Sequence, residues 1–254
     1  MVSNPVQVLL FSTLYPNAAQ PNHGVFVENR LRHTVALGGV EATVLAPAPF
    51  FPFSHAVFGR YGVYARVPQS ERRHGMEVLH PRYLVFPRMS DFTPWFLYRS
   101  ALAAVRRLQK MGRSFDVIDA HYFYPDGVAA ALLGRALRIP VVITGRGSDL
   151  TLISRHPLAG RRIRWAISEA SVVVAVCEDL RRHLLRLGAD ARHSVTLRNG
   201  VDLDHFSPGN RAAARAALGL KRFTLLSVGA LIRRKGHHIV IKTLANLPDC
   251  DLLI

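Results

Sequence analysis

The sequence has few cysteines, no long apolar run and few acidic residues. Its two cysteines, Cys177 and Cys250, lie in separate apolar stretches and form neither a disulfide pattern nor a metal-binding pattern, which fits a reduced, cytoplasmic setting. No stretch approaches the roughly 18 apolar residues that a transmembrane helix needs. The apolar run at residues 6–12 is too short for a signal peptide, and no basic region precedes it.

Several catalytic motifs are also missing. No G-x-G-x-x-G follows the first strand-like segment, which counts against a dinucleotide-dependent dehydrogenase. No G-x-S-x-G supports serine-dependent hydrolysis. The 12 histidines are scattered, and no Cys/His cluster has ligand spacing, so the sequence predicts no metal site.

Positive charge is abundant. The chain has 33 Lys and Arg against 17 Asp and Glu, a net charge of +16, which favours anionic partners such as phosphorylated small molecules or an acidic membrane. A merely solvated, arginine-rich surface explains the same balance. Specific nucleic-acid binding is the least favoured reading, because no helix-turn-helix, zinc-finger or RNA-binding signature is present.

Apolar strand-like segments alternate with helix-like segments along most of the chain. Hydrophobic residues make up 49% of it, enough for a sizeable core. Strands that are apolar throughout and alternate with helices are typical of a parallel sheet covered on both faces. The predicted fold is therefore α/β, a doubly wound, Rossmann-like parallel sheet. Its ligands should bind in the loops at the carboxyl ends of the strands. The segments are strands at 6–12, 40–47, 115–121, 140–145 and 171–177, and helices at 24–39, 92–111, 126–137, 157–170 and 178–188.

A domain boundary is predicted where turn-forming residues gather. Residues 199–210, NGVDLDHFSPGN, contain Asn-Gly and Pro-Gly pairs and few core residues. We expect a first domain at 1–198, a hinge at 199–210 and the start of a second domain at 211–254. Because the last segment stops within an apolar strand, we expect the chain to be a fragment. The alternative is that residues 223–254 complete the first sheet.

Four stretches, in this order, resemble glycosyltransferase family 4, whose members have the GT-B fold. They are HGVFVENRLRHTVALGGVEATVLAP, FDVIDAHYFYPDGVAAALLGRALRIPVVITGRGSD, ASVVVAVCEDLRRHLLRLGA, and NGVDLDHFSP followed by LLSVGALIRRKGHH. The resemblance implies a retaining transferase that moves a sugar from a nucleotide sugar to a carbohydrate or lipid-linked acceptor, without a metal or other cofactor. It also implies an acceptor-binding N-terminal domain and a donor-binding C-terminal domain.

The same resemblance assigns two groups of site residues. Arg233, Arg234 and Lys235 would neutralise the donor diphosphate at the start of a helix, although a solvated basic turn is the alternative. The family often has an arginine where this chain has Ala230, so the division of that role among the three cations stays open. His121, at the end of a predicted strand, would lie near the transferred sugar.

Four segments complete the predicted site. Asn22, His23 and Gly24 precede the first long helix, where glycine permits close approach of a ligand to the backbone. The long segment 48–75, with no clear period, is expected to vary with the acceptor.

The other two loops follow later strands. Gly145 and Gly147 indicate a close-approach turn, and Asp149 would either bind acceptor hydroxyls or cap the next helix. Asn199 is expected in the hinge turn, with a secondary role toward the ligand.

Because the family's two donor-flanking carboxylates would lie beyond residue 254, we expect little or no turnover by this chain alone. A non-catalytic acceptor-binding or membrane-docking module is the alternative. In that case the basic helices near 92–112 and 158–168 would lie on anionic lipid at the inner face of the membrane.

Overall fold

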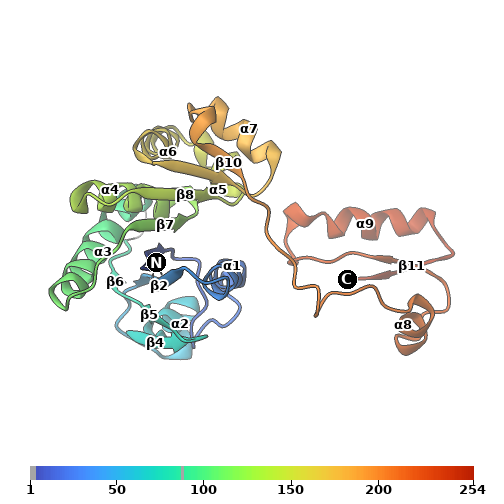
Figure 1. Cartoon of the computed structure of the whole chain (residues 1–254). Coiled ribbons are helices and arrows are strands. Elements are labelled where there is room, and N and C mark those ends of the chain that lie inside the picture. The colour runs from blue at the N-terminus through green and yellow to red at the C-terminus, as the bar shows by residue number, and fades with distance from the viewer. Residues whose placement is uncertain (1–3, 87–88) are drawn as a thin grey trace. The chain divides into compact units, whose positions relative to one another are not determined.

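The computed structural model describes residues 4–86 and 89–254, and the chain divides into two compact units, Met1–Gly200 and Val201–Ile254. The first unit is a three-layer α/β structure built on one sheet (Figure 1). Its strands are β1 (Val6–Phe11), β2 (Val40–Leu45), β3 (Ala48–Pro49), β4 (Ser70–Arg73), β5 (Met76–Leu79), β6 (Arg82–Tyr83), β7 (Val117–His121), β8 (Val141–Gly145), β9 (Val172–Ala175) and β10 (Ser194–Thr196). Its helices are α1 (Val25–Ala36), α2 (Arg60–Arg66), α3 (Thr93–Lys110), α4 (Val128–Leu137), α5 (Ser148–Thr151), α6 (Pro157–Glu169) and α7 (Glu178–Arg186).

The large sheet has eight strands in the order β10-β9-β8-β7-β1-β2-β5-β4. Every neighbouring pair is parallel except β4 with β5, which is antiparallel. Strands β2, β5 and β4 lie on one side of β1, and the later strands β7 to β10 lie on its other side. The fold is therefore doubly wound, as the sequence predicts.

Side-chain alternation along β1 explains why both faces of the sheet are covered. Leu9 and Phe11 belong to the larger apolar cluster, which the helices α3, α4, α6 and α7 complete. Leu10 belongs to the second cluster, with residues of α1, β2 and β5. Successive strand residues point to opposite faces, so a strand buried on both sides must be apolar at every position.

Residues 48–75 are more regular than the sequence predicts. After β3, the turn η1 (Ala56–Phe58) and α2 precede β4, and β3 pairs with β6 in a separate two-stranded sheet. Strands β5 and β6 follow this segment, and residues 84–86 have no regular structure. Within residues 48–75, the rings of Phe51, Phe53, Phe58 and Tyr61 pack against one another. Contacts of this kind do not produce a regular spacing of apolar residues in the sequence.

Short helical turns complete the first unit. They are η2 (Ser90–Phe92), η3 (Phe123–Gly127), η4 (Ile153–Arg155) and η5 (Ala191–His193). Among the described residues, no helix has the length and apolar character needed to cross a bilayer.

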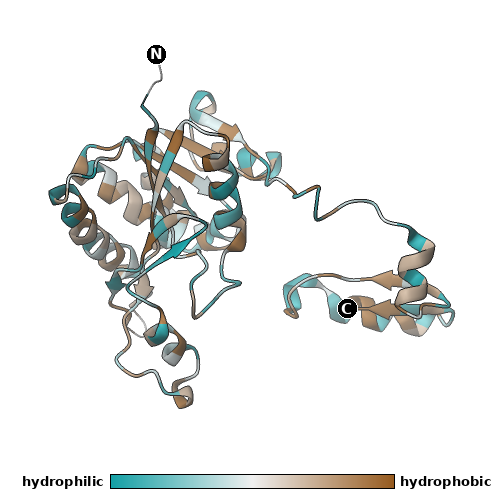
Figure 2. Cartoon of the chain, turned by 60° about the horizontal axis from the view of Figure 1, so that its bottom comes forward, coloured by the Kyte–Doolittle hydropathy of each residue, from teal (hydrophilic) through white to brown (hydrophobic). Residues whose placement is uncertain are grey.

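The second unit contains α8 (Arg211–Ala217), β11 (Phe223–Leu226), η6 (Arg233–Lys235), α9 (His237–Thr243), η7 (Leu244–Asn246) and β12 (Cys250–Leu253). Strands β11 and β12 are parallel and form their own two-stranded sheet. They do not extend the eight-stranded sheet, so the alternative in which residues 223–254 complete that sheet is wrong. The colouring of Figure 2 shows hydrophobic residues on these strands and on α9, and Leu226 and Ile239 are 71% and 61% exposed.

The predicted turn at Asn199 and Gly200 is displaced in the structure. Neither residue lies in a turn, and the turn falls at residues 203–205 instead. The Asp202 carboxylate fixes it by accepting hydrogen bonds from the backbone N–H groups of Asp204 and His205, both at 3.1 Å. An Asp side chain that bonds two residues ahead is an effective turn former, which outweighs the Asn-Gly pair here.

Candidate active site

The loops after β1, β7 and β8 meet at the carboxyl edge of the large sheet, where the sequence places the site. The Ser12 hydroxyl oxygen lies 3.2 Å from both the His121 carbonyl oxygen and Oδ2 of Asp126, and its single proton is shared between these two acceptors, which joins the loops after β1 and β7. The Tyr122 backbone N–H donates to the Thr144 carbonyl oxygen at 2.9 Å, which joins the loops after β7 and β8. Three loops from distant parts of the sequence therefore form one surface.

His121 is the last residue of β7, and its side chain is fully buried. Its Nδ1 atom lies 2.7 Å from a terminal guanidinium nitrogen of Arg146, and its Nε2 atom lies 3.3 Å from Oδ2 of Asp119. Burial is the main cause that lowers the pKa of His121; the Asp119 carboxylate acts against it, and Arg146 and Arg30 add to the lowering. The imidazole is therefore neutral at physiological pH.

Arg146 is the centre of this arrangement. Besides His121, its guanidinium donates to Oδ1 of Asn199 at 2.7 Å and lies 4.9 Å from the centre of the Phe26 ring. Burial lowers the pKa of Arg146 to about 10, and the like charge of Arg30 contributes. The guanidinium stays charged at neutral pH, because about 10 is still well above 7.

Asp126 is a second buried ionisable group beside this cluster. Its carboxylate accepts hydrogen bonds from the Thr13 backbone N–H at 2.8 Å, the Thr13 hydroxyl at 3.0 Å and the Ser12 hydroxyl at 3.2 Å. Burial raises the pKa of Asp126 to about 7, although these hydrogen bonds act in the opposite direction. Asp126 therefore links the end of β1 to the segment after β7.

In the first predicted loop, Asn22 is exposed, His23 is half-buried and Gly24 is buried. Nε2 of His23 lies 3.1 Å from the Thr13 carbonyl oxygen. Gly24 has φ +74, and a Cβ atom there would lie 2.4 Å from the carbonyl carbon and oxygen of Leu14. The close approach that requires glycine is thus to the chain's own backbone. Ligand contact by Asn22 or His23 stays a prediction.

The loop after β8 is held together by Asp149. Its fully buried carboxylate accepts from the backbone N–H groups of Gly147 at 2.7 Å, Phe123 at 2.9 Å and Arg146 at 3.1 Å. Asp149 lies inside the first turn of α5, whose N-cap residue Gly147 makes no side-chain cap, so the carboxylate joins the loop before the helix instead of capping it. A role in acceptor binding stays a prediction. Gly145 packs tightly, since a Cβ atom there would lie 2.4 Å from Leu150 Cδ1. Gly147 has φ +138, which favours glycine.

A cavity of about 210 Å³ opens beside these loops. Its polar lining comes from the loop after β1 and from the aromatic residues of α2 and β6. Segment 48–75 contributes Ala48, Pro49 and Tyr64 to the lining, and its role as an acceptor loop stays a prediction. The polar and aromatic lining residues are Thr13, Tyr15, Asn17, Gln20, His23, Tyr64 and Tyr83.

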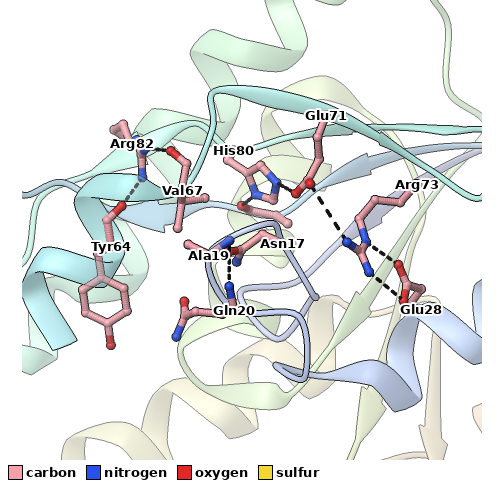
Figure 3. Close-up of polar contacts among 11 residues, drawn as sticks. Asn17, Ala19, Gln20, Glu28, Tyr64, Val67, Glu71, Arg73, His80 and Arg82 are labelled. Atoms are coloured by element: carbon pink, nitrogen blue, oxygen red, sulfur yellow. Dashed lines mark hydrogen bonds and ion pairs between the residues drawn. The ribbon is translucent and has the colours of Figure 1, made fainter. Parts of the chain in front are cut away.

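Figure 3 shows how the walls of this cavity are fixed. The Asn17 side-chain oxygen accepts from the Ala19 and Gln20 backbone N–H groups at 3.1 and 2.9 Å, which holds the loop after β1. Arg82 donates to the Tyr64 carbonyl oxygen at 2.9 Å and to the Val67 carbonyl oxygen, which holds α2.

An ion-pair chain in the same view attaches β4 to α1. His80 bridges the Ala46 carbonyl oxygen and Glu71, both at 2.8 Å. Arg73 then lies 4.0 Å from Glu71 and pairs with buried Glu28 at 2.6 Å. Polar β4 joins the sheet edge by antiparallel backbone pairing with β5, and these charge pairs add the side-chain contacts that its sequence can make.

The three predicted donor cations lie in the second unit. Arg233, Arg234 and Lys235 form η6 and are exposed. They precede α9 rather than occupying its first turn, since Gly236 with φ +77 separates them from His237. The three cations thus lie immediately before the N-cap of α9, and their role toward a diphosphate stays a prediction.

Sequence reasoning did not select Arg146, Asp119 or Asp126 as site residues. Two signals were available. Asp119 and His121 are polar and two residues apart in an otherwise apolar strand, so they share one face. Arg146 lies inside the loop TGRGSD, between Gly145 and Gly147, which are both among the predicted site residues.

Within the described residues, no group of three or more His, Cys, Asp and Glu side chains could hold a metal ion. Independence of a metal stays a prediction.

Comparison with known proteins places the chain in a family. The sequence model of Glycosyltransferase Family 4 matches residues 24–205. A Bacillus subtilis protein described as a teichuronic acid biosynthesis glycosyltransferase, TuaC, is 29% identical over 96% of this chain and 63% of its own length. The D-inositol 3-phosphate glycosyltransferase 1 of Catenulispora acidiphila is 33% identical over 54% of this chain and 35% of its own length.

The solved structures agree on the fold. Anabaena Alr3699/HepE in complex with UDP-glucose has a TM-score of 0.58 and 18% identity, over 97% of this chain and 59% of that one. The chain thus spans less than two thirds of the length of these relatives. The predicted GT-B, Rossmann-like fold and the predicted family are confirmed: the chain belongs to glycosyltransferase family 4.

Proposed function

We propose that the chain forms the acceptor-binding side, and the beginning of the donor-binding side, of a retaining glycosyltransferase. The donor is a nucleotide sugar, and the acceptor is a carbohydrate or a lipid-linked sugar. Family membership and the names of the relatives support sugar transfer. The observation that carries the acceptor assignment is the cavity at the carboxyl edge, because Thr13 both lines it and bonds Asp126 beside His121.

The lining of the cavity suits sugar hydroxyls. Asn17 and Gln20 offer amide groups, Tyr64 and Tyr83 offer aromatic faces and hydroxyls, and His23 offers a ring nitrogen. Such mixed polar and aromatic pockets fix the orientation of a ligand through a few convergent polar groups. An acceptor hydroxyl held there would be oriented toward the sugar to be transferred.

The departing diphosphate needs positive charge. In this proposal Arg233, Arg234 and Lys235 supply it, so that leaving-group charge is stabilised without a metal ion. His121 steadies the transferred sugar rather than removing a proton from the acceptor.

An NMR titration of the 254-residue chain with a panel of methyl glycosides, including methyl glucoside and methyl glucuronide, tests the acceptor assignment. We expect at least one sugar to shift resonances of the cavity residues. Tyr64→Ala should weaken that binding, by about 1 kcal/mol or more if the ring is a contact. Tyr61→Ala is the matched control, since Tyr61 lies on the same helix, is 41% exposed and does not line the cavity.

The absence of shifts with every sugar, or equal effects of the two tyrosine variants, contradicts the acceptor site. A transfer assay with a panel of nucleotide sugars tests the second half of the proposal. The chain alone should give little or no turnover, and robust turnover would show that it already holds a complete donor site.

A second candidate function, docking on an anionic membrane, has an observation of its own. A cavity of about 570 Å³ lies between the start of α3 and α6, lined by aromatic residues and Arg162. Phe92 and Trp95 at its rim are 52% and 51% exposed, and Arg161 and Arg164 of α6 are exposed. Aromatic rings beside arginines are typical of surfaces that bind lipid headgroups. Such docking would place a cytoplasmic protein on the inner face of the membrane.

Sedimentation with phosphatidylglycerol and phosphatidylcholine vesicles distinguishes this candidate. We expect binding to the anionic vesicles alone, reversed by salt and weakened by Trp95→Ala. Leu37→Ala is the control, because Leu37 is 89% exposed at the end of α1. Equal binding to both vesicle types, or to neither, contradicts membrane docking.

A further inference from the structure

His121 faces one partner that can only donate hydrogen bonds. Its Nδ1 atom lies 2.7 Å from a guanidinium nitrogen of Arg146. A guanidinium has five N–H donors and no acceptor, so Nδ1 must be the acceptor and cannot carry a proton. The ring is then neutral, and its single proton lies on Nε2.

The other side of the ring agrees with this tautomer. Nε2 lies 3.3 Å from Oδ2 of Asp119 without the alignment of a hydrogen bond, so a proton on Nε2 is close to a carboxylate but has no acceptor among the described residues. The charged groups that face His121 are Asp119 from its own strand, Arg146 from the loop after β8 and Arg30 from α1. Of these, only Asp119 would favour a protonated imidazole, and Arg146 occupies the nitrogen that would take the second proton.

Arg146 is itself held from two further sides. It donates to the Asn199 side chain at 2.7 Å, and the Phe26 ring lies 4.9 Å from its guanidinium carbon. Asn199 is exposed and is followed by Gly200, the last residue of the first unit. The orientation of the guanidinium toward His121 thus depends on the residue at which the chain leaves this unit.

We propose that Arg146 is a positioning residue that fixes the tautomer of the buried, neutral His121, with the ring proton on Nε2, and joins it to Asn199. The inference rests on the proposed site role of His121, but its test does not require sugar transfer. In this state Nδ1 is occupied, and Nε2–H can only donate. His121 therefore serves as a neutral hydrogen-bond donor and not as a general base.

Nitrogen NMR of the chain labelled with ¹⁵N in its histidine rings tests the proposal directly, with His121→Asn used to identify the signal. In the unmodified protein we expect the Nε2–H tautomer and no titration of His121 between about pH 5.5 and 8. In Arg146→Gln the fixed tautomer should be lost, and the ¹⁵N signals of His121 should show Nδ1–H as well as Nε2–H, because nothing then holds Nδ1 as an acceptor. Arg146→Lys, which retains a charged donor, should keep the Nε2–H tautomer. Arg106→Gln, an exposed arginine of α3, is the matched control.

Two outcomes overturn the proposal: a proton on Nδ1 in the unmodified protein, or a His121 signal that Arg146→Gln leaves unchanged. If Arg146→Gln does not fold, Asn199→Ala tests the proposal instead. Asn199 is exposed, and this substitution removes the hydrogen bond that the Arg146 guanidinium donates to its side chain. We expect Asn199→Ala to shift the His121 nitrogen signals, and unchanged signals contradict the link. Failure of the sugar titration with a correct tautomer would remove the proposed function alone.

Discussion

Replacement of Gly24 by alanine should destabilise the first unit strongly, because two separate costs coincide there. Gly24 has φ +74, a conformation that is strained for residues with a Cβ atom. The new Cβ atom would also lie 2.4 Å from the carbonyl carbon and oxygen of Leu14 and 2.9 Å from the Tyr15 nitrogen. These neighbours are backbone atoms, so the clash cannot be relieved by rotating a side chain.

Gly39 provides a control that separates the two costs. Its φ is +73, almost the same as that of Gly24, and nothing lies within 4 Å of an added Cβ atom. Gly39→Ala should therefore lower the unfolding free energy only through backbone strain, by about 1–2 kcal/mol. Gly24→Ala should add an overpacking cost of about 1–3 kcal/mol, for a total of about 2–5 kcal/mol. Lost freedom of the unfolded chain affects both variants equally and cancels in the difference.

Urea unfolding followed by tryptophan fluorescence measures this difference. The chain has two tryptophans, Trp95 and Trp165, and both lie in the first unit, so the signal reports that unit alone. We expect Gly24→Ala to unfold at a clearly lower urea concentration than Gly39→Ala. Equal midpoints would refute the reasoning that the loop after β1 packs directly against the start of α1.

Three further predictions concern charge. The pKa of Asp126, raised by burial to about 7 against an ordinary 3.8, means that the folded state binds this proton more tightly than the unfolded state. The unfolding free energy should therefore fall as the pH rises from about 4 to 7, by an amount on the order of 4 kcal/mol. Urea unfolding should show this loss relative to Asp126→Asn, and a constant difference between the two proteins contradicts it. Glu28→Gln, which breaks the buried pair with Arg73, should lower the unfolding free energy by about 1–3 kcal/mol. Glu77→Gln, which breaks the exposed pair with Arg113, should cost less than about 1 kcal/mol, and equal losses would mean that burial does not matter here. Finally, EDTA should leave the calorimetric affinity for a nucleotide sugar unchanged, whereas a large loss of affinity would point to a bound metal ion.

Much of the fold could be predicted because its central strands are apolar throughout. Segments such as VVITG and SVVVAVC indicate strands buried on both faces, and their alternation with helices gives the parallel order. Strand β4, SERR, could not be recognised, since it has no apolar face; it pairs with β5, and its Arg73 side chain pairs with Glu28. An ion pair between residues 45 positions apart leaves no local pattern.

The site was predictable in location but not in detail. The rule that ligands bind at the carboxyl ends of parallel strands placed His121 and the loop of residues 144–149 together. The sequence could not tell whether the Asp149 carboxylate faces a ligand or its own backbone. It also could not single out Arg146, whose partners His121 and Asn199 lie 25 and 53 residues away.

The central claim is that acceptor sugars bind at the carboxyl edge of the large sheet. Photo-crosslinking with a diazirine-bearing glycoside, followed by mass spectrometry of the labelled peptides, tests it most directly. The label should fall on residues 13–23, Tyr64 or Tyr83, and an excess of the unlabelled glycoside should suppress it. Labelling of the cavity between α3 and α6 instead, or labelling that the competitor does not reduce, would contradict the claim.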